Sequence, residues 1–254
     1  YQSSLIRELS KSKKFYLKVF YCSNITISDY KDNEMNKVIN WNYDLLSGYD
    51  FDFLKSFFNS KIPSFFFPIN IGLLYKLKKN KFNYILVHGH ARFYNIFIII
   101  FSKLIGINVF LRSESNDMHS KKKTLSKITL KFLNLFIKNF LAIGELNKKY
   151  YLDRGIKNNK IVMMPYTVDN NYFMNYKLNL RDKNKFINKY NLQNKKIYLF
   201  AAKLIHRKNI IFFLNSFIDF INSETIYKKK AFLIIVGDGE LREKVLKLIS
   251  PFKE

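Results

Sequence analysis

The fold class follows from residues 197–249, which read IYLFAAKLIHRKNIIFFLNSFIDFINSETIYKKKAFLIIVGDGELREKVLKLI. Two short apolar runs rich in β-forming residues, 197–202 and 231–237, predict buried strands. Each run precedes a helical pattern. Over 209–222 the apolar residues Ile210, Leu214, Phe217 and Ile221 recur at helical spacing, and 241–249 is a second predicted helix. Strands that alternate with helices are typical of a parallel α/β sheet.

The same alternation extends towards the N-terminus. The pattern predicts helices over 2–10, 70–79, 93–104 and 121–136, and strands over 15–22, 84–89, 108–112, 140–144 and 160–165. Residues 23–40 are predicted to form a polar loop, and 41–54 an aromatic segment with a turn at Gly48. Asn and charged residues dominate 169–195, where only a short helix over 182–190 is predicted.

This change in composition predicts two domains. We expect an N-terminal domain over 1–170, a connection over 171–195 and a C-terminal domain over 196–254. The C-terminal series has too few elements to complete a domain. We therefore expect the C-terminus to be cut short. We expect the same of the N-terminus.

Composition limits the possible functions. The 254 residues are 48% hydrophobic, which excludes disorder, and a lone Cys22 excludes a disulfide framework or a cysteine-based zinc site. There is no signal-peptide core, and the apolar run 96–101 is too short to cross a bilayer, so we expect a cytoplasmic protein. The net charge of +25 favours anionic partners, although the Lys- and Asn-rich usage of an AT-rich genome would also raise it.

Residues 201–210, AAKLIHRKNI, place cations where a strand gives way to a helix. Lys203 follows the expected strand end at Ala202, and Lys208 comes just before a helix start near Asn209. A helix N-terminus favours a phosphate. The alternative is that both are solvated loop lysines. The following GDG turn puts Gly237 and Gly239 between a strand and a helix, but the third glycine of a dinucleotide-binding turn is missing.

Two further loops follow predicted strands. VHGHARF, 87–93, carries His88 and His90, and LRSESND, 111–117, carries Arg112 and Glu114. Open α/β sheets bind ligands at the carboxyl ends of their strands, so these side chains are candidate site residues, with structural loop roles as the alternative. Nothing near the two histidines completes a metal-ligand set, so no metal site is expected.

Together these segments resemble the family 4 (group 1) retaining glycosyltransferases of the GT-B fold. AAKLIHRK is similar to the family's G-R-L-x-x-x-K-G element, and VGDGELREKV to its V-G-x-G-x-x-R-x-x-L element. GIKNNKIVMMPYTVDNNYF, 155–173, resembles the family's inter-domain segment. YQSSLIREL and VINWNYDLLSGYDFDFL resemble N-terminal segments of a family subset. The resemblance covers almost the whole chain and implies two Rossmann-like domains.

The resemblance also implies a site and a reaction. Lys203, Lys208, Gly237 and Gly239 would hold the diphosphate of a nucleotide-sugar donor without a metal, and the sugar would be transferred with retention. His90 and Glu114 would be catalytic, Glu114 standing where many members place a loop histidine. His88 and Arg112 would face a sugar, glycan or lipid-linked acceptor. Because the nucleotide-sugar is a substrate, no cofactor is expected.

Departures from the family pattern leave other readings open. Lys203 replaces an arginine, Ala201 and Ala202 stand where a glycine is usual, and Tyr166 and Thr167 replace Asn-Gly. The family's E-x7-E carboxylates would lie beyond residue 254, so these residues alone are expected to be inactive. The alternatives are a non-catalytic GT-B homologue and a basic nucleic-acid-binding protein. The second is less favoured, because the basic residues are spread along the chain. Lys121, Lys122 and Lys123 suggest peripheral contact with an anionic membrane.

Overall fold

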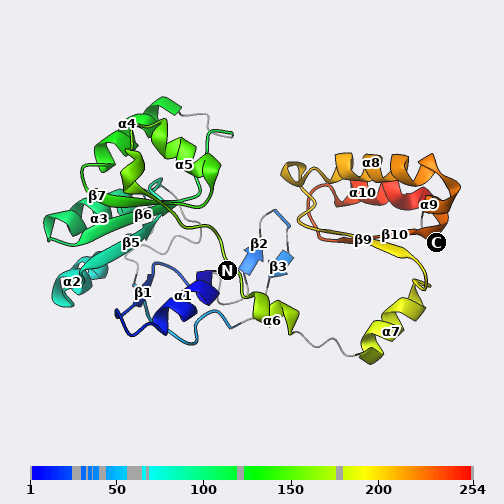
Figure 1. The fold of residues 1–254 in the computed structure, drawn as a ribbon, viewed down its shortest axis with the longest axis horizontal. Coiled ribbons are helices and arrows are strands. Elements are labelled where there is room, and N and C mark those ends of the chain that lie inside the picture. Colours follow the sequence, from blue (N-terminus) through cyan, green and yellow to red (C-terminus); the bar gives the residue numbers. More distant parts are fainter. Residues whose placement is uncertain are drawn as a thin grey trace. The chain divides into compact units, whose positions relative to one another are not determined.

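A computed structural model gives the fold. It describes residues 2–24, 30–32, 34–35, 37–39, 44–55, 65–66, 69–118, 123–175 and 180–252. The chain forms two compact units (Figure 1). The first comprises Tyr1–Ile27 and Tyr43–Asn170, and the second Ser28–Asn42 and Asn171–Glu254. The domain boundary near residue 170 stays a prediction, because compactness does not test whether each part folds alone.

A four-stranded parallel sheet forms the centre of the first unit. Its strands follow each other in chain order: β5 (Tyr84–His88), β6 (Asn108–Ser113), β7 (Ile137–Ala142) and β8 (Ile161–Met163). Helix α3 (Phe93–Leu104) packs on β5 and β6, and α5 (Glu145–Leu152) packs on β7 and β8. In the β5–β6 register His88 lies opposite Arg112, so two of the predicted site residues meet at the carboxyl edge of the sheet.

The remaining elements of the first unit extend this core. They are α1 (Gln2–Ser10), α2 (Ile71–Lys79), α4 (Lys123–Leu133) and a parallel pair of strands, β1 (Lys18–Tyr21) with β4 (Asp50–Phe53). A 3₁₀ turn over Asn158–Lys160 precedes β8. Phe20 of β1 and Leu54 join the cluster that contains the fully buried Val109 and Leu111 of β6. Strand β6 is therefore largely buried, as its apolar sequence predicts, while β1 is only partly buried.

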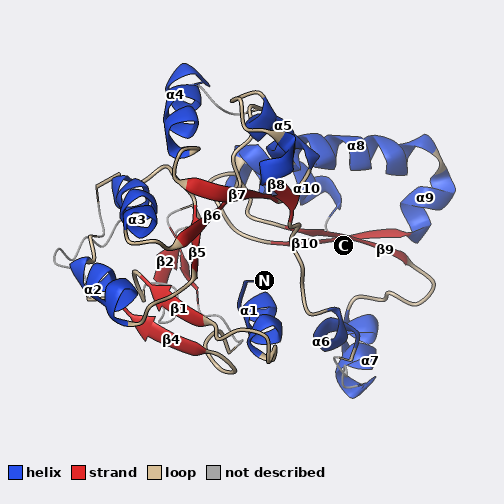
Figure 2. Ribbon diagram, turned by 60° about the vertical axis from the view of Figure 1, so that its left-hand side comes forward, coloured by secondary structure: helices blue, strands red, loops and turns tan. Residues whose placement is uncertain are grey.

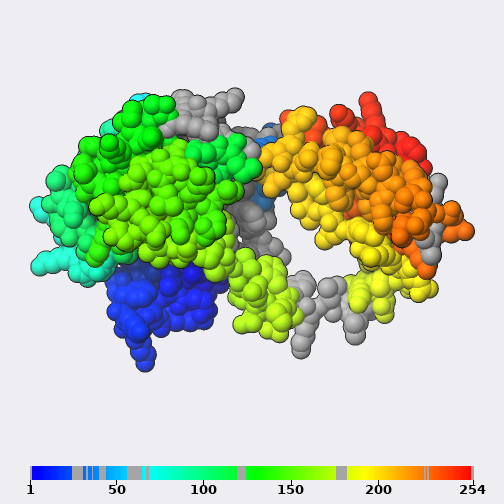
Figure 3. All heavy atoms as spheres, turned by 45° about the horizontal axis from the view of Figure 1, so that its top comes forward, coloured from blue at the N-terminus to red at the C-terminus, as the bar shows by residue number. Residues whose placement is uncertain are grey.

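The second unit has a smaller parallel pair, β9 (Lys196–Ala201) with β10 (Ala231–Val236). Helices α8 (Ile210–Ser223) and α10 (Arg242–Ile249) cover one face of it (Figures 1 and 2). The apolar positions Ile210 and Leu214 of α8 are buried there, as predicted. Figure 3 shows α9 (Thr225–Lys230) beside α8 on the surface of this unit, both in orange. Two short helices, α6 (Asn170–Met174) and α7 (Leu180–Lys189), precede β9, and 3₁₀ turns occupy His206–Lys208 and Ser250–Phe252. Both units are thus Rossmann-like α/β structures, as predicted.

Three segments differ from the sequence prediction. Residues 23–40 are not only loop, because β2 (Tyr30–Asp32) and β3 (Lys37–Ile39) form an antiparallel hairpin. This hairpin belongs to the second unit. The aromatic segment 41–54 contains β4, and α5 was not expected at all. The hairpin escaped prediction because ion pairs to distant residues, described below, hold it rather than an apolar face.

No helix in the described part of the chain has the length and apolar character needed to span a membrane. The predicted cationic cluster falls largely outside the described residues: Lys121 and Lys122 are not described, and Lys123 begins α4. In α4, Leu130 and Leu133 are fully buried, while Ile128 and Phe132 are 63% and 49% exposed. Contact with an anionic membrane stays a prediction.

Candidate functional site

A cavity opens at the carboxyl ends of β5 and β6. It has a volume of about 270 Å³ and is lined by Gln2, His88, Gly89, Arg112, Ser113 and Glu114. Three of the predicted site residues, His88, Arg112 and Glu114, therefore share one cavity. This is the edge at which open α/β sheets bind ligands.

The loop after β5 is held in place by main-chain contacts. Gly89 has a φ of +79°, a left-handed conformation that favours glycine, and its N–H donates to the carbonyl oxygen of Arg112 at 2.7 Å. The side-chain amide of Asn95, on α3, donates to the carbonyl oxygens of His88 at 2.9 Å and Gly89 at 3.1 Å. Sequence analysis did not single out Asn95, which lies in the first turn of α3, just after the loop that it orients.

Arg112 is the buried cation of this cavity. Its side chain is almost fully enclosed, at 3% exposure, and donates from Nη2 to the carbonyl oxygen of Met164 at 3.4 Å. The guanidinium also lies 5.0 Å from the centre of the Tyr166 ring. Among the described residues its Nε has no hydrogen-bond partner. A buried donor without a partner is costly, so an acceptor on a ligand would be stabilised here.

His88 lines the cavity and is exposed to solvent. Protein atoms that crowd the ring lower its pKa, and the nearby Arg112 lowers it further, while Glu114 opposes both effects. The neutral imidazole can accept a hydrogen bond, so His88 suits a polar acceptor such as a sugar hydroxyl.

His90 is not one of the residues that line the cavity. It is buried, at 7% exposure, and its Nδ1 has no hydrogen-bond partner among the described residues. Burial lowers the pKa of His90 to about 4, with Arg154 as the second cause. The structure brings His88, Arg112 and Glu114 together but does not add His90 to them, and a catalytic role for His90 stays a prediction.

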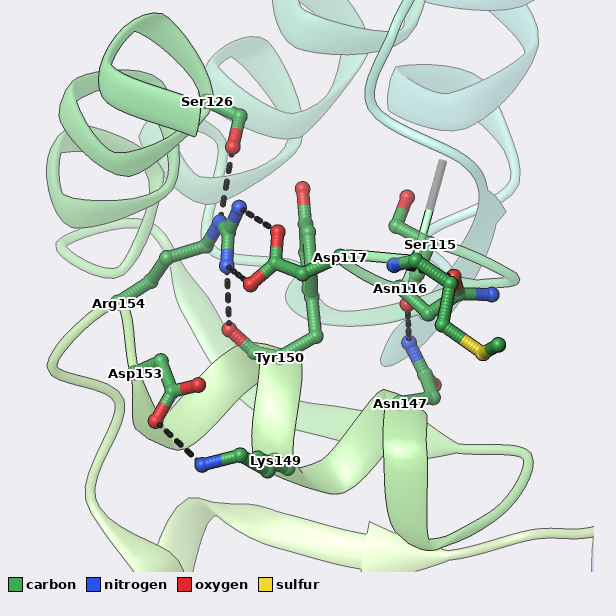
Figure 4. A network of polar contacts seen from close by, with 10 residues as sticks. Ser115, Asn116, Asp117, Ser126, Asn147, Lys149, Tyr150, Asp153 and Arg154 are labelled. Atoms are coloured by element: carbon green, nitrogen blue, oxygen red, sulfur yellow. Dashed lines mark hydrogen bonds and ion pairs between the residues drawn. The ribbon is translucent and has the colours of Figure 1, made fainter. Parts of the chain in front are cut away.

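A network that the sequence did not reveal supports the loop carrying Glu114 (Figure 4). Arg154, which follows α5, makes a two-pronged ion pair with Asp117, at 2.7 and 3.0 Å. Its Nε donates to the Ser126 hydroxyl of α4 at 2.8 Å, and its guanidinium lies 3.5 Å from the centre of the Tyr150 ring. Arg154 is 3% exposed, so the pair is shielded on its arginine side. One arginine thus joins α4, α5 and the loop after β6.

Two more α5 residues hold the same loop. The Asn147 amide donates to the carbonyl oxygen of Ser115 at 2.7 Å, and its oxygen accepts from the N–H of Ile143 at 3.1 Å. The Tyr151 hydroxyl shares a hydrogen bond of 2.8 Å with that of Ser113. Both loop contacts flank Glu114, so α5 fixes the main chain from which that carboxylate extends.

In the second unit, the loop after β9 and the loop after β10 pack closely on each other. The N–H of Leu204 donates to the carbonyl oxygen of Asp238 at 2.8 Å, and Leu241 N–H donates back to Leu204 at 2.9 Å. A Cβ on Gly237 would lie 1.9 Å from the carbonyl oxygen of Ala202, and one on Gly239 would lie 2.6 Å from that of Leu204. Both glycines are therefore required by this close approach, whether or not they also meet a ligand.

The cations of this unit differ in their surroundings. Lys203 is hydrogen-bonded to two carboxylates, Asp32 at 2.6 Å and Glu34 at 2.8 Å. Lys208 is exposed, at the end of a 3₁₀ turn just before α8. Asn209, the residue before α8, has a φ of 55° and its side chain does not cap the helix. The start of this 14-residue helix thus lies beside a cation, which favours an anion.

With this geometry established, similarity to solved structures identifies the fold. HepE from Anabaena, solved in complex with UDP, is similar at a TM-score of 0.51 and 12% identity, over 80% of this chain and 53% of HepE. A glycosyltransferase from Rickettsia africae is similar at a TM-score of 0.52 and 20% identity, over 80% of this chain and 52% of that protein. The chain has a GT-B-type fold.

That assignment agrees with the fold predicted from the sequence. The chain spans about half the length of these solved structures, 53% of HepE and 52% of the Rickettsia glycosyltransferase. No protein-family model matches the chain, and no curated protein matches it. At these low identities the similarity concerns the fold and not the reaction.

Proposed function

We propose that this chain is part of a glycosyltransferase that transfers a sugar from a nucleoside diphosphate donor to a glycan, lipid-linked or small-molecule acceptor. One observation carries the proposal: the loop 202–208, with Lys203 and Lys208, lies at the carboxyl end of β9 and at the start of α8. This is where a Rossmann-like unit binds a diphosphate. The resemblance of the sequence to the family's donor-binding elements, and a fold shared with UDP-bound HepE, support it.

The chemistry follows from where charge develops. As the bond between the sugar C1 and the diphosphate oxygen breaks, the leaving nucleoside diphosphate gains negative charge. Cations that are already in place stabilise this charge more in the transition state than in the ground state. Lys203 and Lys208 would supply this stabilisation without a metal ion. We extend the proposal to retention at C1, on the resemblance to retaining family members.

The cavity of the first unit would take the acceptor. Its volume of about 270 Å³ suits one sugar residue, and Arg112 and His88 offer a buried cation and a neutral imidazole to its hydroxyls. Glu114 is the cavity's carboxylate and is the side chain we assign to the reacting centre. His90 does not line this cavity, and we assign it no contact with the acceptor.

Nucleotide binding tests the proposal. Titration calorimetry with UDP and GDP should detect binding to the chain. Lys208→Ala should weaken it about tenfold or more, since a hydrogen bond to a charged group contributes about 1.5–3 kcal/mol. Lys244→Ala removes another exposed lysine of the same unit, from α10, and should leave the affinity unchanged.

Two outcomes would contradict the proposal. One is the absence of binding by any nucleoside diphosphate, and the other is an equal effect of Lys208→Ala and Lys244→Ala. Tight and steeply salt-dependent binding of RNA, with no preference for a diphosphate, would instead favour the nucleic-acid-binding alternative.

A further inference from the structure

The β2–β3 hairpin places two carboxylates on the cation that we assign to the donor diphosphate. Lys203 Nζ lies 2.6 Å from Asp32 Oδ2 and 2.8 Å from Glu34 Oε2. Arg207 Nη2 lies 3.6 Å from the other Glu34 oxygen. Both acidic residues and both basic residues belong to the second unit. Two negatively charged side chains of the chain thus already contact Lys203.

The hairpin is shaped for this contact. Asp32 is the last residue of β2 and is 8% exposed. Its Oδ1 accepts from the N–H groups of Glu34 and Met35, both at 3.0 Å, which leaves Oδ2 directed at Lys203. The turn therefore holds Asp32 in place before the lysine is considered.

A second ion pair runs in the opposite sense. Lys37 of β3 pairs with Asp238, which lies between the two glycines of the loop after β10. The N–H of Gly239 donates to Asp238 Oδ1 at 2.8 Å and orients this carboxylate. Asp32 of the hairpin thus pairs with Lys203 of the loop after β9, and Lys37 of the hairpin pairs with Asp238 of the loop after β10. Because the two pairs have opposite polarity, they fix the position of the hairpin against the two loops.

We infer that the β2–β3 hairpin is an internal competitor of the donor diphosphate: Asp32 and Glu34 occupy Lys203, and an incoming diphosphate must displace them. The inference rests on the proposed function, since it concerns the regulation of the same site. The carboxylates keep Lys203 from free anions until a ligand of greater charge density and with more contacts arrives. A diphosphate meets that requirement, because it gains Lys208 and the start of α8 as well.

The contact is of a strength that a ligand can overcome. The side chains of Lys203 and Glu34 are 30% and 48% exposed, so solvent and salt screen the Glu34 pair. Hydrogen bonds from Lys203 lower the pKa values of Asp32 and Glu34, and the two carboxylates raise the pKa of Lys203. All three groups are therefore charged at neutral pH, as competition requires. Such a competitor reduces the apparent affinity for the diphosphate, because only the molecules in which Lys203 is free of the carboxylates can bind it.

The test compares two pairs of charge-removing substitutions. Asp32→Asn with Glu34→Gln removes the competing carboxylates. Asp219→Asn with Glu224→Gln removes the same charge from two exposed acids of the same unit, which have no ion pair to Lys203 among the described residues. UDP and inorganic pyrophosphate are titrated into each protein at low salt. We expect the hairpin variant to bind both at least about fivefold more tightly than the wild type, and the control to gain less than about twofold.

Hydrogen exchange of the unmodified chain provides a second measurement, which does not depend on how the variants fold. Saturating pyrophosphate should speed exchange of the amides within 30–39 as the hairpin leaves Lys203. Equal affinities in the wild type, the hairpin variant and the control would overturn the inference and leave the proposed function standing. So would weaker binding by the hairpin variant, or unchanged exchange of 30–39 at saturation. Absence of binding by every protein would overturn both.

Discussion

His90 is a neutral ring in a buried position. The imidazole is 7% exposed, and burial together with Arg154 brings its pKa to about 4. In the unfolded chain a histidine titrates near 6.5. Between these two values the unfolded state binds a proton that the folded state does not. The stability that follows is fully present above the unfolded pKa and is lost as the pH falls towards the folded pKa.

We therefore predict a pH-dependent stability that His90→Gln removes. The difference between the two pKa values corresponds to about 3 kcal/mol, lost between roughly pH 6.5 and 4. Urea unfolding, followed by circular dichroism across this range, should show a shallower decline for His90→Gln than for the wild type. His206→Gln, which changes an exposed histidine, should decline like the wild type. Parallel curves for all three proteins would contradict the assignment of this effect to His90.

Gly237 and Gly239 of the GDG turn show how much a short motif predicts about the contacts of its residues. The sequence placed Gly237 and Gly239 in a turn between a strand and a helix, and the family resemblance assigned them to the donor diphosphate. In the structure other groups of the chain lie close to both glycines. The groups approached are the carbonyl oxygens of Ala202 and Leu204. A short motif predicts that a side chain is not tolerated, but not which atoms exclude it. The diphosphate role of these glycines stays a prediction.

Helix α5 holds the loop after β6 through contacts that no local sequence pattern reveals. Asn147, Tyr151 and Arg154 lie three to four residues apart, so they share one side of the helix and of its end. Their partners Ser115, Ser113 and Asp117 are distant in the sequence. In the sequence Asp117 stands within five residues of Arg112, but the structure pairs Asp117 with Arg154. Only the folded chain shows which cation reaches this carboxylate.

Because Arg154 is shielded, we predict that Arg154→Met destabilises the first unit by about 3 kcal/mol. The substitution keeps the length of the side chain but removes the hydrogen bonds of the buried guanidinium to Asp117, to Ser126 and to the carbonyl oxygen of Tyr150, and a hydrogen bond of a charged group contributes about 1.5–3 kcal/mol. Lys149→Met is the matched control. It removes a 3.4 Å pair with Asp153 in which the side chains are 71% and 45% exposed, so the expected loss is below about 0.5 kcal/mol. Chemical denaturation of both variants measures the difference. Equal losses of stability would show that the Arg154–Asp117 pair contributes no more than the exposed Lys149–Asp153 pair.

Strands and helices with apolar patterns were predicted from the sequence, and so was the polar helix α7, whereas the charged β2–β3 hairpin was not. The four strands of the main sheet were expected from their apolar runs. In the structure β6 and β7 are largely buried, whereas β5 and β8 are partly exposed, with Tyr84 and Val162 at 54% and 48% exposure. The hairpin of β2 and β3 was missed because charge, and not apolar burial, holds it. Lys203 and Asp32 are 171 residues apart, so their pairing could not be read from the neighbourhood of either.

Among the described residues, buried side chains form two hydrophobic clusters, each within one unit. The larger cluster holds buried residues from α2 to α5 and from the main sheet, among them Leu130, which is 0% exposed. The smaller has five buried residues, including Leu214 at 1% exposure. The alternation of strands and helices predicted two such series. It did not predict that 28–42 would group with the second unit, because the charges that place this segment there are spread over both halves of the sequence.

Separate clusters predict separate opening. Leu130→Ala and Leu214→Ala make the same change in the two clusters, and each should cost about 2–5 kcal/mol because it leaves a cavity in a packed core. Under native conditions the amides of each unit exchange by opening that unit, so Leu130→Ala should speed exchange in β5–β8 and leave β9 and β10 unchanged. Leu214→Ala should do the reverse. The expected acceleration is more than about tenfold within the altered unit, since about 1.4 kcal/mol is a factor of ten in the opening constant. Peptide-resolved hydrogen exchange compares both variants in one experiment, and each serves as the control for the other. Acceleration of both sets of strands by either variant would mean that the units open as one, and the two clusters would then have to be treated as a single cooperative core.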